Sequence, residues 1–412
     1  MVETAAEILT KKPPDLIRKQ IRINGIVQGV GFRPFIYNLA NRFNLTGTVT
    51  NTADGVIIEV QGSVVAIGKF SNSIEAEAPP VSLVTSFKST IIPLKDGGIF
   101  SILPSQNNSS VSTFISPDIA VCPDCISECF DPKDRRYLYP FINCTNCGPR
   151  YTIIENIPYD RSHTSMRHFE LCTDCQKEYD DPNDRRFHAQ PNACLDCGPL
   201  CEILDSEGTS LSSSNSIKST VEEIKKGKTV AIKGLGGFHL SVDATNEEAV
   251  NRLRERKGHE SKPLAIMVKD LKYADTFFKL TEDEKKELES SAHPIVLVEK
   301  KSISPLAESV APGLRHVGIM LPYTPIHHLL FYYDAPPLVM TSANISDEPI
   351  CIDNSEAVNR LKGIADFFLV HNRNILTRTD DSVLLVQNGN RSFIRRSRGF
   401  VPMPIQLPFS VP

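Results

Sequence analysis

Residues 26–40, IVQGVGFRPFIYNLA, join an apolar β run to a helical pattern through a loop that contains Gly29 and Gly31. In such a loop, successive backbone N–H groups ahead of a helix can hold an anion. Pro34 suits the first helical turn, and Arg33 could add a bidentate guanidinium to a bound phosphate. Taken alone, the stretch is a weak signal for a phosphate site, and a tight strand-to-helix turn is the favoured interpretation.

The surrounding sequence alternates strand and helix patterns in the order β-α-β-β-α-β. The β runs cover residues 20–27, 81–89 and 98–103, and a hairpin over 45–62 turns at Ala53-Asp54-Gly55. Helices are predicted over 34–43 and 64–76, the first with Phe35, Leu39, Ala40 and Phe43 on one face. This order predicts a split-βαβ, ferredoxin-like domain.

The chain has 412 residues, which predicts two to four domains. A net charge of −4 gives no general attraction to nucleic acid, and no apolar run is long enough for a membrane span. The first residues lack the apolar core of a signal peptide, so we expect a cytoplasmic protein. In that compartment its 11 cysteines favour metal binding over disulfides.

Two polar, Ser/Asn-rich stretches at 105–117 and 205–216 are interpreted as linkers. They delimit a flexible tail at 1–19, a first domain at 20–104, a second at 118–204 and a third at 217–412. The architecture expected is therefore multidomain, with α+β and α/β parts.

The middle segment is an internal repeat of CxxC, DPxDRR and CxxCGP motifs. Its units are CPDCISECFDPKDRRYLYPFINCTNCGP, residues 122–149, and CTDCQKEYDDPNDRRFHAQPNACLDCGP, residues 172–199. Paired thiolates two residues apart suit tetrahedral zinc, so the repeat predicts two structural zinc ions. The predicted ligands are Cys122, Cys125, Cys144, Cys147, Cys172, Cys175, Cys194 and Cys197.

Self-similarity favours pairing of the CxxC motifs within each repeat, although pairing across the repeats stays open. Cys129 and Cys201 have no counterpart in the other repeat, and we interpret His163, His168 and His188 as surface or packing residues. Four thiolates leave no open position for catalysis at zinc. Each Arg-Arg pair has aspartates beside it, so nucleic-acid binding is not expected.

The third segment alternates short apolar β runs with helical patterns, which predicts an α/β domain. Thr341, Ser342 and Asn344 follow a β run, where α/β folds bind ligands. The cations Arg254, Arg256 and Lys262 suit either phosphate binding or a solvated helix face, and glycines at 234, 236 and 237 could admit a ligand close to the backbone. The segment contains no Walker-type phosphate loop.

The pair VQGVGFR and GTVTNTADG, in a βαββαβ frame, resembles the acylphosphatase family. The resemblance implies that Arg33 holds the substrate phosphate and that Asn51 orients the attacking water. It also implies a phosphate-binding loop formed by Gln28, Gly29, Val30, Gly31 and Phe32.

Four stretches of the third segment resemble the YrdC-like family, which adenylates a carbamate with ATP. They are KGLGGFHLSVDATN, RERKGHESKPLAIM, MTSANISDEP and FIRRSRGFVP. The resemblance implies an ATP site, with magnesium accompanying the nucleotide as substrate. The implied nucleotide-binding residues are Lys233, His239, Arg254, Arg256, Lys262, Thr341, Ser342, Asn344 and Arg395.

The three units in this order resemble the HypF family, the carbamoyltransferases of nickel–iron hydrogenase maturation. The resemblance implies hydrolysis of carbamoyl phosphate to carbamate and phosphate, followed by formation of carbamoyl-adenylate and pyrophosphate from carbamate and ATP. In that family a further C-terminal domain passes the carbamoyl group to the C-terminal cysteine of the partner HypE. The sequence stops before such a domain, so we expect a fragment or a truncated form.

Two other functions remain open at this point. One is a threonylcarbamoyl-adenylate synthase-like enzyme of tRNA modification, although that family lacks the acylphosphatase and zinc units. The other is a non-catalytic zinc scaffold, in which Arg33 and Asn51 would be incidental.

Overall fold

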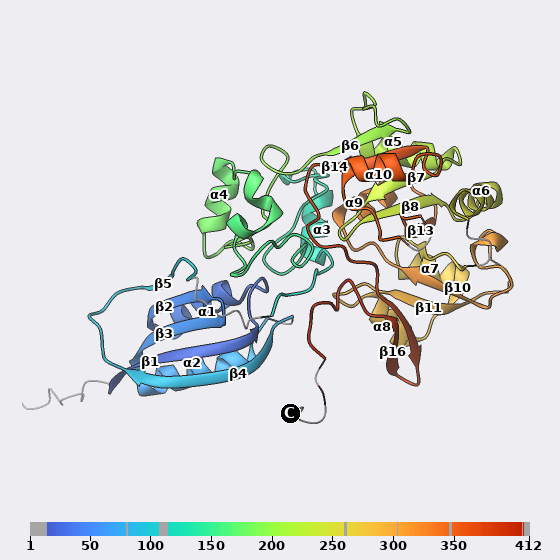
Figure 1. Ribbon diagram of the computed structural model, residues 1–412. Coiled ribbons are helices and arrows are strands. Elements are labelled where there is room, and N and C mark those ends of the chain that lie inside the picture. The colour runs from blue at the N-terminus through green and yellow to red at the C-terminus, as the bar shows by residue number, and fades with distance from the viewer. Residues whose placement is uncertain are drawn as a thin grey trace, which may run out of the picture. The chain divides into compact units, whose positions relative to one another are not determined.

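The computed structural model describes residues 15–79, 81–106, 114–258, 262–302, 304–345, 348–405 and 407. The chain divides into two compact units (Figure 1). Unit 1 comprises Met1–Ser116, Ile157–Asp160 and Asp180–His188, and unit 2 comprises Pro117–Asn156, Arg161–Tyr179 and Ala189–Pro412. Among the described residues, no helix has the length and apolar character to cross a membrane.

Unit 1 is built on one five-stranded sheet in the order β4-β1-β3-β2-β5. The strands are β1 (Leu16–Ile26), β2 (Thr46–Thr52), β3 (Gly55–Ser63), β4 (Leu83–Ile92) and β5 (Phe100–Ile102). All pairs are antiparallel except β2 with β5. This is the predicted ferredoxin-like arrangement. Strand β1 begins inside the tail expected over residues 1–19, and residues 1–14 lie outside the described part.

Two helices of unit 1, α1 (Phe32–Arg42) and α2 (Val64–Ala76), contact each other and pack on β2 and β3 respectively. Ser63 caps α2 through a bond to the Ala66 N–H. The buried apolar face of α1 consists of Phe32, Ile36, Leu39 and Ala40. The predicted face was wrong for Phe35 and Phe43, which are only half-buried: Phe32 and Ile36 fill the core, and Phe43 lies past the last residue of the helix.

Unit 2 contains one mixed sheet of 11 strands in the order β16-β15-β11-β12-β9-β13-β8-β7-β14-β6, with β10 paired to β11. Its strands are β6 (Cys201–Asp205), β7 (Val230–Lys233), β8 (Phe238–Asp243), β9 (Ile266–Met267), β10 (Phe278–Lys279), β11 (Ile295–Lys300), β12 (His316–Met320), β13 (Leu338–Ser342), β14 (Phe367–His371), β15 (Val383–Gln387) and β16 (Asn390–Arg395).

The helices of unit 2 include the two that open the cysteine repeats and those that follow along the chain. They are α3 (Pro123–Phe130), α4 (Thr173–Asp180), α5 (Ser216–Lys225), α6 (Glu247–Lys257), α7 (Leu271–Phe277), α8 (Glu282–Leu288), α9 (Pro325–Tyr332) and α10 (Asn354–Arg360), with short 3-10 helices at Arg161–His163, Ser165–His168 and Glu308–Val310. The last residue of α4, Asp180, is assigned to unit 1.

The expected boundary at 205–216 differs from the structure. Strand β6 leads into that stretch, yet it pairs antiparallel with β14 along its whole length. The pairing runs from Cys201 opposite His371 to Asp205 opposite Phe367. The large sheet therefore takes its edge strand from the end of the second cysteine repeat. Strand pairing between residues so distant in sequence has no local signal.

Candidate active sites and zinc centres

The loop between β1 and α1 has the geometry of an anion site. Gly29 and Gly31 have φ values of 72° and 75°, a left-handed conformation that only glycine adopts at low cost. Gly31 is the N-cap of α1 and supplies no side-chain cap, and the first turn contains no acidic residue. The N-terminal N–H groups and the positive end of the helix dipole therefore favour a negatively charged ligand here.

Gln28 fixes the loop to its surroundings through buried hydrogen bonds. Its amide Nε2 donates to the Thr52 carbonyl at 2.7 Å and to the Gly55 carbonyl at 2.9 Å. Its Oε1 accepts from the backbone N–H of Tyr159 at 3.0 Å. A single side chain thus joins the loop, the β2–β3 turn and the segment Ile157–Asp160, which also belongs to unit 1.

Arg33 and Asn51 are both buried beside this loop. The Arg33 side chain is 9% exposed, and its Nη2 donates to Asp160 Oδ1 at 2.9 Å. Asn51 lies near the end of β2 with 1% exposure, and its side-chain oxygen has no hydrogen-bond partner among the described residues. A buried amide oxygen without a partner costs free energy unless a ligand or water occupies it. The pair fits a phosphate on the guanidinium and a water on the amide.

His188 contributes to the electrostatics of the same unit. Burial, followed by the positive charge of Arg33, lowers the pKa of His188 to about 4, against the opposing effect of Asp180 and Asp160. The imidazole is therefore neutral at physiological pH. From sequence this residue was interpreted only as a surface or packing residue.

The eight cysteines of the repeats form two groups, one in each repeat. They are Cys122, Cys125, Cys144 and Cys147 in the first and Cys172, Cys175, Cys194 and Cys197 in the second, with the four sulfurs of each group within 4.8 Å of one another. The pairing of CxxC motifs is therefore within each repeat, as the self-similarity favoured.

The sulfur spacing fits zinc. In the first group the Sγ–Sγ distances are 3.7 Å for Cys122–Cys144 and Cys125–Cys147, and 3.8 Å for Cys144–Cys147. In the second, Cys172–Cys194 and Cys194–Cys197 are 3.7 and 3.8 Å apart. A regular tetrahedron with Zn–S bonds of about 2.3 Å has edges of about 3.8 Å. Two structural zinc ions fit, and the spacing excludes disulfides.

The arginines of the first repeat contact the sulfurs of the second cluster. Arg135 donates to the sulfurs of Cys175 and Cys194 at 3.3 Å, and Arg136 donates to Cys175 at 3.4 Å. Arg136 is also ion-paired with Glu178 and donates to the Ala193 carbonyl at 2.9 Å. Four thiolates around Zn²⁺ carry a net charge of −2, and the two guanidiniums offset most of the combined charge of the cluster and Glu178, with which both are ion-paired. Both guanidiniums therefore have structural contacts within the protein.

A cavity of about 380 Å³ lies at the ends of β8 and β13 in unit 2. Ser342 and His239 are direct cross-strand neighbours there. Of the predicted nucleotide residues, His239, Lys262, Thr341, Ser342 and Arg395 line this cavity, together with the carboxylates of Asp380 and Asp381 and apolar side chains such as Leu264 and Met340. An apolar pocket with a few convergent polar groups is typical of ligand sites.

His239 is held by a buried chain of hydrogen bonds. Its Nε2 is 2.8 Å from Asp381 Oδ2, and Asp381 Oδ1 accepts from Arg398 Nε at 2.6 Å. Burial opposes ionisation of Asp381, but the charge of Arg398 and the hydrogen bonds with His239 and Arg398 outweigh it and hold the pKa of Asp381 well below its usual value. The His239 Nδ1 atom has no partner among the described residues. The carboxylate thus orients the ring and leaves Nδ1 to a ligand.

Several predicted residues lie elsewhere. Arg254 donates to the carbonyls of Ser309 and Val310, and Arg256 binds the Ile364 carbonyl and Asp366. Lys233 donates to Asn354 Oδ1 and the His371 carbonyl. Asn344 does not line the cavity, but its Oδ1 accepts from Ser342 Oγ at 2.9 Å. Arg254, Arg256 and Lys233 therefore hold the fold together rather than line the cavity.

The glycines at 236 and 237 also serve packing. A Cβ atom at Gly236 would lie 2.2 Å from the Thr379 carbonyl oxygen, and one at Gly237 would lie 2.7 Å from the Ile350 side chain. These neighbours are parts of the protein, so the close approach expected for a ligand is taken by the chain itself.

Lys257 is a residue that the sequence did not single out. It ends α6 just before Gly258, whose φ of 67° closes the helix, and its Nζ donates to Thr341 Oγ1 at 3.2 Å and to the Ser342 carbonyl. Burial, with the nearby charge of Lys262, lowers the pKa of Lys257 to about 8. In the sequence Lys257 is one of several basic residues in a row, so nothing there indicates that it lies beside two cavity-lining residues.

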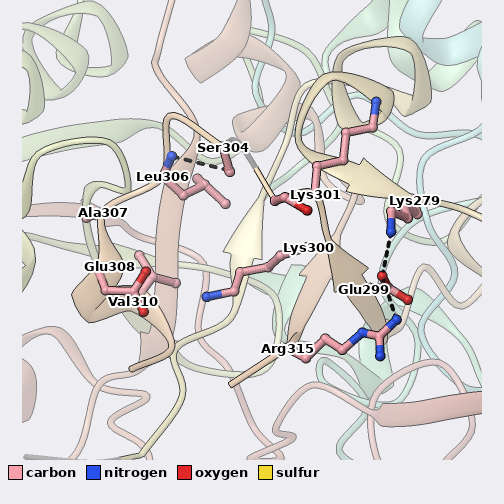
Figure 2. Close-up of a pocket in the computed structure, with 11 residues that line it drawn as sticks. Lys279, Glu299, Lys300, Lys301, Ser304, Leu306, Ala307, Glu308, Val310 and Arg315 are labelled. Atoms are coloured by element: carbon pink, nitrogen blue, oxygen red, sulfur yellow. Dashed lines mark hydrogen bonds and ion pairs between the residues drawn. The ribbon is translucent and has the colours of Figure 1, made fainter. Parts of the chain in front are cut away.

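A second hollow of about 460 Å³ lies near β11 and the segment 304–310 of unit 2 (Figure 2). It contains four cations, but Lys279 and Arg315 both bind Glu299, at 2.7 and 3.0 Å, and Lys300 donates to the Ala311 carbonyl. Figure 2 shows Glu299 between its two partners. None of the predicted nucleotide residues lies here, whereas five of them line the cavity at β8 and β13.

Comparison with known proteins matches three family models in order along the chain. The acylphosphatase model matches residues 19–102, and the HypF finger model matches residues 121–154 and 171–204. The Sua5/YciO/YrdC model, described as telomere recombination, matches residues 222–397. The third match includes all residues that line the cavity at β8 and β13.

Curated relatives match nearly the whole chain. Carbamoyltransferase HypF of Synechocystis sp. is 49% identical over 94% of this chain and 51% of its own length. Probable carbamoyltransferase HypF of Methanocaldococcus jannaschii is 43% identical over 95% and 51% respectively. The chain thus spans about half the length of the curated relatives it matches.

Solved structures give the same result. A full-length HypF in a phosphate- and nucleotide-bound form superposes with a TM-score of 0.93 at 47% identity, covering 97% of this chain and 52% of that one. HypF from T. kodakarensis superposes with a TM-score of 0.89 at 46% identity, covering 95% and 50%. Over the part of those proteins that it spans, this chain matches the HypF family, with an acylphosphatase domain, a pair of HypF fingers and a YrdC-like domain.

Proposed function

We propose that this chain carries out two steps of carbamoyl transfer: hydrolysis of carbamoyl phosphate to carbamate and phosphate, then adenylation of carbamate by ATP. The observation that carries the proposal is the site in unit 1, where buried Arg33 and the unpartnered oxygen of Asn51 flank an anion-binding loop. The high identity to proteins named carbamoyltransferase HypF supports the choice of acyl group.

In the first step the loop N–H groups from Gly29 to Arg33 and the guanidinium of Arg33 bind the phosphoryl oxygens. Asn51 Oδ1 accepts a hydrogen bond from the attacking water. The new bond joins the water oxygen to phosphorus, and the bond from phosphorus to the carbamate oxygen breaks. Charge stabilisation and water positioning supply the catalysis, so no covalent nucleophile is required.

In the second step a carbamate oxygen attacks the α-phosphorus of ATP, which arrives with magnesium, and pyrophosphate leaves. Lys262 and Arg395 line the cavity and can balance the phosphate charge. Thr341 and Ser342 supply hydroxyls, and Lys257 fixes the end of their strand by donating hydrogen bonds to Thr341 Oγ1 and the Ser342 carbonyl. His239 Nδ1 is placed to accept a hydrogen bond from the ligand.

The final acceptor follows from the family resemblance. We propose that the carbamoyl group passes to the C-terminal cysteine of HypE in hydrogenase maturation, a step that the family assigns to a further domain. A cytoplasmic location suits ATP-dependent chemistry and the reduced thiols that zinc requires.

Carbamoyl-phosphate-dependent exchange of pyrophosphate into ATP tests the proposal. We expect exchange with the unaltered chain and none with Arg33→Ala, whereas Arg22→Ala, which alters an exposed arginine of β1, keeps it. Adding ammonium carbamate should restore exchange in Arg33→Ala, because the second site then receives its substrate directly.

The contrary outcomes are distinct. Absence of exchange in the unaltered chain would contradict the whole proposal. Exchange in Arg33→Ala with carbamoyl phosphate alone would remove the role of the first site. Exchange that requires threonine and bicarbonate instead would indicate a threonylcarbamoyl-adenylate synthase.

A further inference from the structure

The acyl-phosphate site of unit 1 contains a carboxylate that comes from outside the acylphosphatase fold. Asp160 lies between the two cysteine repeats in sequence, and its segment, Ile157–Asp160, is part of unit 1. It accepts a hydrogen bond from Arg33 Nη2 at 2.9 Å, and its side chain is 24% exposed.

Asp160 is held in this position by its own bond to Arg33 and by its neighbour in sequence. The backbone N–H of its neighbour Tyr159, which is buried, donates to Oε1 of Gln28 in the anion loop. The segment Asp180–His188 completes the unit, with the ring of Phe187 packed edge-on against Tyr37 of α1 at 5.5 Å. The carboxylate is therefore a fixed part of the site.

A carboxylate in this position is unfavourable for a simple phosphate ligand. Two like charges within a few ångströms of each other repel, and the loop otherwise attracts anions. Arg33 offsets part of that repulsion, but a neutral neighbour would leave more of its charge for the phosphate. The Asp160 carboxylate therefore favours a ligand that also offers it a hydrogen-bond donor.

The ligand that satisfies this pair carries an anionic phosphate for Arg33 and an N–H donor for Asp160. An ionised carboxylate only accepts hydrogen bonds, so it favours an acyl group with an N–H and disfavours one with a methyl group. Carbamoyl phosphate has an amino group at that position, and acetyl phosphate does not.

The family comparison separates this residue from the hydrolytic machinery. The acylphosphatase model matches residues 19–102, which include Arg33 and Asn51 but not Asp160. Asp160 also lies between the two ranges matched by the HypF finger model. Hydrolysis and selection of the acyl group can thus reside in different segments of the chain.

We propose that Asp160 is a specificity-determining residue: its carboxylate accepts a hydrogen bond from the amino group of carbamoyl phosphate and so selects this substrate over acyl phosphates without an N–H. The inference rests on the proposed function of unit 1.

The test compares release of phosphate from carbamoyl phosphate and from acetyl phosphate, after subtraction of the enzyme-free rates. The full chain is used unaltered and as Asp160→Ala, Asp160→Asn and Asp96→Asn, the last removing an exposed carboxylate of the same unit. Zinc content and thermal unfolding establish that each variant is folded, and the near-isosteric Asp160→Asn serves where Asp160→Ala does not fold.

We expect the kcat/KM ratio, carbamoyl over acetyl phosphate, to fall at least tenfold in Asp160→Ala. A charge-assisted hydrogen bond is worth about that factor or more. Asp160→Asn should show a smaller fall, because its amide oxygen still accepts, and Asp96→Asn should show none.

Two results would overturn the inference. An equal loss on both substrates would show that Asp160 only positions Arg33, and an equal gain would show that it only obstructs the anion site. If the unaltered chain hydrolyses neither substrate, the proposed function itself fails, which is a separate outcome.

Discussion

The two cysteine repeats have the same motifs but different partners. Fifty residues apart, Leu138 and His188 both adopt a left-handed backbone conformation, with φ of 56° and 53°, so the local chain path is repeated. The loop of the first repeat stays within unit 2, and its Arg135 and Arg136 contact the second cluster. The loop of the second repeat, Asp180–His188, belongs to unit 1.

The aromatic residue after each Arg-Arg pair shows the same difference. The hydroxyl of Tyr137 lies 2.9 Å from that of Tyr332 in α9, and the Phe130 ring stacks on the same tyrosine at 5.1 Å. The equivalent Phe187 packs against Tyr37 of α1. The loop of one repeat thus contacts the YrdC-like fold, and the loop of the other contacts the acylphosphatase fold. A shared motif determines the local structure, and the side chains around it determine the partner.

Zinc removal should have the largest effect and should distinguish the clusters. Structural zinc contributes on the order of 10 kcal/mol to folding of its site. Two thiols of the second cluster are half-exposed, against one in the first, so we expect a chelator to extract the second ion sooner. A colorimetric zinc assay should show two phases. Cys194→Ser should retain one ion per chain and Cys351→Ser two, and two ions in Cys194→Ser would contradict the assignment.

Arg136→Ala should weaken the second cluster rather than the first, although it lies in the first repeat. Arg136 is 1% exposed and ion-paired with Glu178, and loss of such a partner costs about 3–5 kcal/mol. Denaturant unfolding and zinc competition measure the effect. Arg135→Ala, whose side chain is 30% exposed, should have a smaller one. Zinc loss from the first cluster alone would contradict the contact between the arginines of the first repeat and the second cluster.

Phe187→Ala should destabilise unit 1 by about 3 kcal/mol, because it removes a buried ring. Since the loop Asp180–His188 is part of that unit, we also expect the KM for carbamoyl phosphate to rise. The matched change in the first repeat, Tyr137→Phe, removes only an exposed hydroxyl contact and should cost at most about 1 kcal/mol. Equal effects of the two substitutions would remove the distinction between the loops.

His188→Leu, which gives the second loop the leucine of the first, should have the smallest effect near neutral pH and should act mainly in acid. The pKa of His188 is about 4 in the folded chain, below the usual 6.5, so the unfolded chain binds more protons between these values. Stability therefore falls as pH drops from about 6.5 to about 4, on the order of 3 kcal/mol in total. His188→Leu should flatten the dependence of the unfolding midpoint on pH in that window. An unchanged pH dependence of the unfolding midpoint would contradict this role of His188.

Much of this molecule could be predicted from local patterns. The loop with Gly29 and Gly31, the hairpin at Ala53-Asp54, and the grouping of cysteines each depend on residues close in sequence or on a strict repeat. Short-range chemistry determines these features, so a single sequence suffices.

The features that escaped prediction depend on long-range contacts. Arg254, Arg256 and Lys257 are all basic residues at the end of α6, so the sequence does not distinguish them. Only the packing of α6 decides that Lys257 reaches Thr341. The role of β6 requires a partner strand more than 160 residues away. Asp160 has no motif around it, and its meeting with Arg33 follows from the fold of unit 1 alone.

Because unit 1 is assembled from three separate pieces of chain, its gene cannot be cut at the end of the first piece without changing the enzyme. A fragment that ends at Ser116 would retain Arg33 and Asn51 but lose Tyr159, Asp160 and Phe187. By the inference above, such a fragment would be a less discriminating acyl-phosphate hydrolase. Substrate preference measured on an excised domain would therefore not transfer to the intact chain, and a recombinant swap of acylphosphatase domains would have to carry residues 157–160 and 180–188 with it.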